Sequence, residues 1–123
     1  MNRLILLLAA VVLLAVPALT DNRQEAVSKL EQDVKSSPNN PELWLHLGFA
    51  YRKADQIDQA QSAFQKTLSL DPNNREAMAM LALINEKKNQ KSEAIRLWKN
   101  YLAIETDPTK RDMAEKHIHV LSQ

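Results

Sequence analysis

Apolar side chains, most of them large, recur at steps of three and four residues in two stretches between residues 41 and 74. The first stretch holds Trp44, Leu47 and Tyr51, and the second holds Ile57, Ala60, Phe64 and Leu68. Residues at this spacing lie on one face of an α-helix, so each stretch predicts a helix with a single apolar stripe. Two stripes that face each other predict an antiparallel helix pair.

The ends of this pair carry residues with known local preferences. Asn40 can cap a helix, and Pro41 suits the first helical position, where no backbone donor is needed. Asp71 stands directly before Pro72, and a residue before proline is pushed out of the helical region. We therefore expect the first helix to begin at Pro41 and the second to end before Pro72.

Small residues predict where the two helices cross. Gly48 and Ala60 are the small residues among the large ones that form the two stripes. Helices that approach closely need a residue without bulk at their contact. The backbones are therefore expected to come closest at Gly48 and Ala60.

Residues 75–108 repeat the same spacing of apolar residues, but fewer of the residue types are the same. The places of Trp44, Leu47, Gly48, Ala60 and Phe64 are taken there by Met78, Leu81, Ala82, Ala94 and Trp98. Asp55 and Asn89 stand at matching places between the helices of each pair, where a residue that tolerates left-handed backbone is expected. A second helix pair is therefore predicted.

Single helices are expected on both sides of the two pairs. Residues 22–37 match only the second half of the unit, and residues 109–122 can form a last helix that caps the stack. The predicted fold is an all-α helical solenoid over residues 21–123, with a half repeat, full repeats at 41–74 and 75–108, and a C-terminal capping helix.

The sequence motif in residues 41–74 resembles that of the tetratricopeptide repeat family. The pattern W-x2-L-G-x2-Y, A-x3-F, P is carried by Trp44, Leu47, Gly48, Tyr51, Ala60, Phe64 and Pro72. In that family the first helices of successive pairs line a concave groove that holds an extended peptide or a helix of a partner. The resemblance implies a groove made by Glu42, Leu45, Phe49, Arg52, Lys53, Glu76, Ala79, Leu83, Glu86 and Lys87.

Apolar residues form the floor of this expected groove. Leu45 and Phe49 stand where family members that clasp a chaperone's C-terminal carboxylate carry lysine and asparagine, so no carboxylate clamp is expected. Phe49 lies outside the stripe that closes the helix pair, so its truncation is expected to spare folding and to weaken partner binding. The alternative is that Leu45, Phe49, Ala79 and Leu83 pack on the chain's own terminal helices or on a second copy.

The first twenty residues have the layout of a secretory signal. Arg3 supplies a positive charge, residues 4–16 are apolar, and the first polar segment begins at Asp21. The apolar run of residues 4–19 is shorter than the roughly 18 to 20 residues expected of a spanning helix. A cleaved signal and an uncleaved membrane anchor both remain open, and either would place residues 21–123 in the periplasm or outside the cell.

Charge balance, cysteine content and histidine spacing argue against several kinds of function. Removing Arg3 leaves 15 basic and 15 acidic residues, a balance that argues against a nucleic-acid partner. The chain has no cysteine, which excludes disulfides and cysteine-ligated zinc. His117 and His119 are two residues apart, so on a helix they face different ways and cannot share a metal. We therefore expect no cofactor, no metal and no enzymatic activity.

Three functions are consistent with these features. The first is a scaffold or chaperone adaptor of the cell envelope that binds a segment of another protein in the groove. The second is a structural protein whose apolar groove drives assembly into a dimer or filament. The third comes from a resemblance of residues 30–74 to the periplasmic tetratricopeptide modules of bacterial cytochrome c maturation, which hold the apocytochrome for haem attachment.

Overall fold

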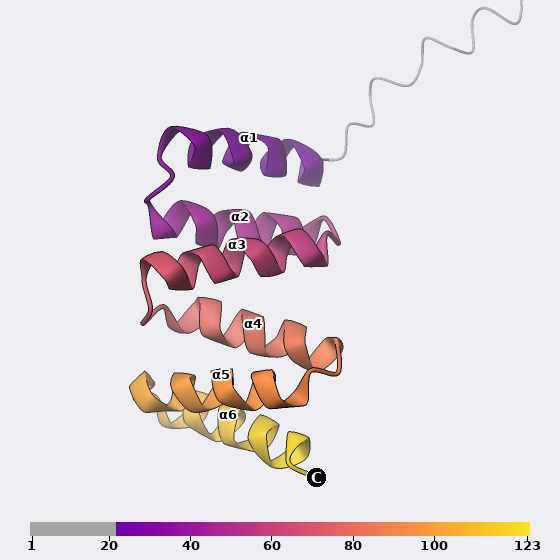
Figure 1. Ribbon diagram of the computed structural model, residues 1–123, viewed down its shortest axis with the longest axis vertical. Helices are drawn as coiled ribbons and strands as arrows, with labels where there is room; N and C mark the ends of the chain where they lie inside the picture. The colour runs from indigo at the N-terminus through magenta and orange to yellow at the C-terminus, as the bar shows by residue number, and fades with distance from the viewer. Residues whose placement is uncertain (1–21) are drawn as a thin grey trace, which may run out of the picture.

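The computed structural model describes residues 22–123, which form six α-helices and no strand (Figure 1). The helices are α1 (Asn22–Ser36), α2 (Pro41–Lys53), α3 (Ile57–Leu70), α4 (Arg75–Lys87), α5 (Lys91–Ile104) and α6 (Pro108–Leu121). They stack in chain order from α1 at one end to α6 at the other. Packing is most extensive between α2 and α3 and between α4 and α5. The helical solenoid with two full pairs, a preceding half repeat and a capping helix is therefore confirmed.

Short polar side chains start three of the helices. The Oδ1 of Asn40 accepts a hydrogen bond from the backbone N–H of Glu42 at 3.1 Å. Asn74 caps α4 in the same way, and Asp107 caps α6 through the N–H of Lys110 at 2.9 Å. Each cap satisfies one of the backbone donors that a helix start leaves unpaired.

The turns inside the two helix pairs share one backbone conformation. Asp55 has a φ of 59° and Asn89 a φ of 57°, and they are the two non-glycine residues with positive φ in residues 22–123. Aspartate and asparagine tolerate this left-handed geometry better than most residues. This confirms the role predicted for both positions and explains why a chain with one glycine can make two such turns.

The crossing of α2 and α3 is as close as the small residues indicated. A Cβ added to Gly48 would lie 2.5 Å from Cε1 of Phe64, far inside the usual contact distance between carbon atoms. Phe64 and Ala60 are both fully buried. Glycine at position 48 therefore lets the phenyl ring of α3 pack directly on the backbone of α2.

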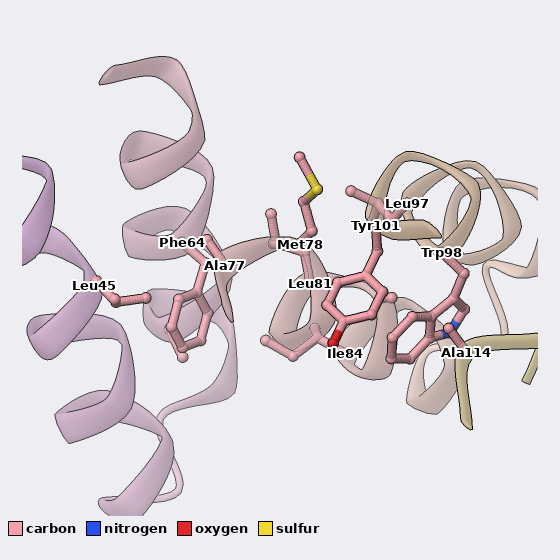
Figure 2. Packing of buried hydrophobic residues seen from close by; sticks show 12 residues of the cluster. Leu45, Phe64, Ala77, Met78, Leu81, Ile84, Leu97, Trp98, Tyr101 and Ala114 are labelled. Carbon is pink, nitrogen blue, oxygen red and sulfur yellow. The ribbon is translucent and has the colours of Figure 1, made fainter. Parts of the chain in front are cut away.

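One apolar core runs from α2 to α6 (Figure 2). Figure 2 shows Leu45 and Phe64 on one side, Met78 and Leu81 of α4 in the middle, and Trp98 on the other side. The same cluster includes Ala82, which is fully buried at the place of Gly48. Ala94, at the place of Ala60, is also fully buried. Because the core is continuous, each pair is stabilised by the pair next to it.

Trp44 is less buried than its place in the stripe predicted. Its ring packs beside a small cluster of Val34, Leu47 and Ala63, and it is half-buried rather than fully enclosed. The ring Nε1–H donates to the carbonyl of Pro38 at 2.8 Å, in the exposed turn before α2. The indole thus ties α2 to that turn, which keeps one edge at the surface.

A buried carboxylate joins the last three helices. Oε1 of Glu105 accepts from the backbone N–H groups of Thr106 and Asp107, each at 2.9 Å, and lies 3.1 Å from Nη1 of Arg75. The hydrogen bond from Asp107, helped by the one from the Tyr101 hydroxyl, lowers the pKa of Glu105. Glu105 therefore fixes the end of α5 to the starts of α4 and α6.

The capping helix contributes an aromatic contact of its own. The ring of His117 stacks on Trp98, with ring centroids 4.8 Å apart, and its Nδ1 lies 2.9 Å from Oε1 of Glu86. The same carboxylate oxygen accepts from Nε1 of Trp98. His117 thus faces the stack while His119 is exposed, as the helical spacing predicted.

The export prediction concerns residues 1–20, which lie outside the described residues. Within residues 22–123, no helix is both long enough and apolar enough to span a membrane.

Candidate partner-binding surface

The residues expected to line one groove are divided by the structure. Leu45 is only 4% exposed and belongs to the core, so it offers a partner little surface. Ala79 is half-buried against the same core. Glu42 and Glu76 line a small hollow beside the turn before α4, and Glu86 is engaged with His117.

An apolar hollow lies between α2 and α4. It has a volume of about 350 Å³, and we call it the α2–α4 hollow. It is lined by Arg52, Asp55, Ile57, Met80, Leu83, Ile84 and Lys87. Leu83 is 38% exposed, which is high for a large apolar side chain in a helix with a buried face. The structure thus brings together three of the predicted groove residues: Arg52, Leu83 and Lys87.

Cations border this hollow without carboxylate partners. Nη1 of Arg52 donates to the thioether sulfur of Met80 at 2.8 Å, so the guanidinium lies across the apolar floor. Within residues 22–123, neither Arg52 nor Lys87 takes part in an ion pair. Asp55 is the one carboxylate in the lining. The hollow therefore combines apolar floor with net positive charge, which suits a segment with apolar side chains and nearby carboxylates.

A second apolar hollow lies between α1 and α2. It has a volume of about 450 Å³, and we call it the α1–α2 hollow. It is lined by Asn22, Arg23, Ala26, Leu30, His46, Phe49, Ala50 and Lys53. Phe49 and Lys53, which were predicted to share a groove with Leu83, therefore line a different hollow.

Phe49 also supports the core, contrary to the sequence-based expectation. Its ring meets Phe64 edge to face, with centroids 5.3 Å apart and planes at 78°. Such pairs contribute to stability beyond the area they bury. Truncating Phe49 would therefore lower stability as well as any binding. Leu83 and not Phe49 is the residue whose change separates binding from folding.

A third hollow has a polar lining. It is about 830 Å³ and is lined by polar residues of α3, α4 and α5 and of the turn before α5, namely Gln61, Gln65, Asn85, Asn89, Gln90, Lys91, Ser92 and Glu93. It has no large apolar side chain that could act as an anchor, whereas anchors of that kind dominate the energy of protein interfaces.

The titratable side chains show contacts that support the fold. Burial and a 2.6 Å hydrogen bond to Glu31 raise the pKa of Tyr51 to about 12, so this hydroxyl stays protonated near neutrality. Burial and Glu105 do the same for Tyr101. In the part of the chain that the structure describes, no group of three or more histidine or acidic side chains could hold a metal ion.

Four residues of the α2–α4 hollow were not predicted to line a groove: Asp55, Ile57, Met80 and Ile84. Met80 and Ile84 stand one helical turn from Leu83 and Lys87, which is the spacing that places residues on one face. That signal was present in the sequence. Ile57 comes from α3, and only the packing of the turn after α2 brings it there.

Comparison with known proteins identifies the repeat. A family model described as tetratricopeptide repeat matches residues 41–74. Superkiller complex protein 3 of Mus musculus is 36% identical over 67 residues, covering 54% of this chain and 4% of the relative. The peroxisomal targeting signal receptor of Saccharomyces cerevisiae is 39% identical over 64 residues, covering 50% of this chain and 10% of the receptor. The chain thus corresponds to a small part of each relative.

A solved structure extends the likeness to the fold. The crystal structure of MamA matches with a TM-score of 0.65 and 26% sequence identity. The match covers 68% of this chain and 48% of MamA. The arrangement of successive helix pairs is therefore shared well beyond the one matched repeat.

Proposed function

Because this chain is a tetratricopeptide repeat protein, we propose that it works as a scaffold or adaptor that holds a segment of another protein in the α2–α4 hollow. Tetratricopeptide domains generally mediate protein–protein interaction and are typically non-catalytic. The surface residues of this chain indicate which kind of segment it binds.

The observation that carries the proposal is the exposed Leu83 between Met80 and two cations. An apolar anchor that enters the hollow would bury Leu83 and the thioether of Met80. Carboxylates beside that anchor would pair with Arg52 and Lys87, which have no ion-pair partner within residues 22–123. The partner segment we propose is therefore an amphipathic helix or an extended strand with apolar and acidic side chains.

The relatives support the general part of this proposal. The name of the yeast receptor says that it receives a targeting signal. Recognition of a short segment is in keeping with the size of the α2–α4 hollow, about 350 Å³, which can take one or two side chains and not a whole domain.

We place this activity in the cell envelope. The support is the sequence of residues 1–20, with its positive start, apolar run and polar boundary. A reporter enzyme that is active only after export, fused behind Gln123, should be active. Activity only of a cytoplasmic reporter at the same position would remove the envelope assignment.

The binding proposal is tested with Leu83→Asp. A carboxylate there would face the apolar floor, so a true partner should bind at least tenfold more weakly. The matched control is Ala103→Asp, an exposed residue of α5 outside both hollows. Proteins retained from an envelope extract by each full-length variant are compared quantitatively with those retained by the wild type.

We expect at least one protein that the wild type and Ala103→Asp retain and that Leu83→Asp does not. Both variants should melt at the same temperature as the wild type. Equal retention of every protein by both variants would show that the α2–α4 hollow is not the working surface.

A further inference from the structure

α1 is the second helix of a repeat, and the face that a first helix would cover lies open. Ala26 and Leu30 stand 34 residues before two core positions of α3. The equivalent places in α3 and α5 are all fully buried: Ala60, Phe64, Ala94 and Trp98. Ala26, in contrast, is exposed and Leu30 is half-buried. The difference arises because α2 covers α3 and α4 covers α5, while no helix of residues 22–123 covers this face of α1.

The two apolar hollows are one surface repeated along the stack. Five lining residues of the α1–α2 hollow have a counterpart 34 positions later, one repeat length, in the lining of the α2–α4 hollow. Arg23, His46, Phe49, Ala50 and Lys53 correspond in this order to Ile57, Met80, Leu83, Ile84 and Lys87. In the α2–α4 hollow, the preceding first helix and its turn supply Arg52 and Asp55. In the α1–α2 hollow that place is open, and the lining reaches inward to Ala26 and Leu30.

The sequence that precedes α1 is poorly suited to form the missing first helix on the uncovered face of α1. In the repeat frame, Leu14 falls where Gly48 stands, at the crossing that tolerates no side chain in α2. Pro17 falls where Tyr51 stands, inside the helix, where proline costs about 3 kcal/mol. A helix with a small residue at the crossing and no proline in its interior would fit better, and another molecule can supply it.

Charge indicates how that helix would be oriented. Lys53 lines the hollow, and among residues 22–123 no carboxylate lines it. α2 runs with its end beside the start of α3, so a helix placed likewise on α1 would end beside Asn22 and Lys53. Cations stabilise the end of a helix through its exposed carbonyl groups. Acidic residues in the last turn of the incoming helix would add ion pairs with Lys53.

We propose that the α1–α2 hollow binds an amphipathic helix of a partner protein, which completes the half repeat in trans. That helix carries an apolar stripe with one small residue at the crossing, in the manner of α2 and α4, and carboxylates in its last turn. This surface is separate from the α2–α4 hollow, so the two can be tested independently.

The probe is a synthetic helical peptide with the sequence of residues 41–53, stapled on its polar side. We use it because α2 is a helix that this fold already seats on an equivalent face, that of α3. The full chain is immobilised through a tag behind Gln123, which lies at the far end of the stack from α1. Binding of the peptide should be saturable. A peptide with Arg52→Glu and Lys53→Glu should bind more tightly, and added salt should reduce the difference.

Protein variants locate the binding. Ala26→Glu, within the hollow, should weaken binding of the peptide at least tenfold. Ser28→Glu is the matched control, because Ser28 is exposed on α1 outside the hollow. Leu83→Asp should leave peptide binding unchanged, which separates this inference from the proposed function. Both α1 residues are exposed, so neither change should alter the melting temperature.

Three results would overturn the inference. Equal binding by the wild type and Ala26→Glu, or none by either, would show that the hollow does not seat a helix. Binding only after removal of residues 1–20 would show that the chain's own segment fills it. A dimer that Ala26→Glu dissociates would show that a second copy does.

Discussion

Gly48→Ala is the change that tests the packing of this fold most sharply. The new Cβ would lie 2.5, 2.7 and 2.9 Å from three ring carbons of Phe64. Non-bonded carbons prefer roughly 3.5 to 4.0 Å, so the ring has to retreat by about 1 Å. Phe64 is fully buried and is held on another side by Phe49, which leaves it little room.

Two opposing effects set the size of the change. Crowding in a packed core costs about 1 to 3 kcal/mol. Alanine is a better helix former than glycine by about 1 kcal/mol, which offsets part of the cost. The net expectation is a loss of roughly 1 kcal/mol, within a range of about 0 to 2, and each lost kcal/mol lowers the melting temperature of a domain of this size by about 4 to 8 °C.

Thermal and urea unfolding followed by circular dichroism measure this directly. The control is the double variant with Phe64→Leu, whose shorter side chain relieves the crowding. In that background Gly48→Ala should become neutral or stabilising, and the coupling energy between the two sites should exceed 0.5 kcal/mol, about the least expected of residues in contact. A higher melting temperature for Gly48→Ala alone would mean that helix propensity outweighs crowding and that the close crossing is not a constraint.

Two further changes probe the second pair and the joint with the capping helix. Trp98→Ala removes a fully buried indole and should cost about 3 to 5 kcal/mol, so urea titration should show a chain close to unfolded. A midpoint near that of the wild type would contradict the packing of α5 against α4 and α6. Glu105 has a lowered pKa, so its carboxylate stabilises the fold above the ordinary glutamate range, and this contribution is lost as pH falls through the lowered value. The wild type should therefore lose stability more steeply below about pH 4.5 than Glu105→Gln, and parallel curves would contradict this.

Most of the fold followed from local signals. The small residue at Gly48, the cap at Asn40, and the left-handed turns at Asp55 and Asn89 each act within one helix or one turn. Their physical effects are the same in any protein, so the sequence pattern predicts them directly.

The candidate surface was harder to predict, because it depends on how successive helices sit against each other. Leu45 and Leu83 stand on similar faces of α2 and α4, yet Leu45 is buried in the core and Leu83 is exposed. Phe49 has no place in the apolar stripe of α2, but its ring reaches Phe64 across the helix pair. Helical spacing gives the direction of a side chain, whereas crossing geometry decides what it meets.

The half repeat at α1 shows a second limit of sequence reasoning. The pattern correctly indicated a second helix without its first. It did not show that the uncovered face would continue into a hollow with Phe49 and Lys53. The open face becomes visible only in the burial of equivalent residues, which are fully buried in α3 and α5 and partly or fully exposed in α1.

We propose that a partner protein lies against the α2–α4 hollow. A photo-crosslinking amino acid at position 83, compared with one at position 103 on α5, tests it in the cells that make the protein. We predict a discrete covalent adduct from position 83, sensitive to Arg52→Glu, and none from position 103. No adduct from position 83, or the same adducts from both positions, would contradict the claim.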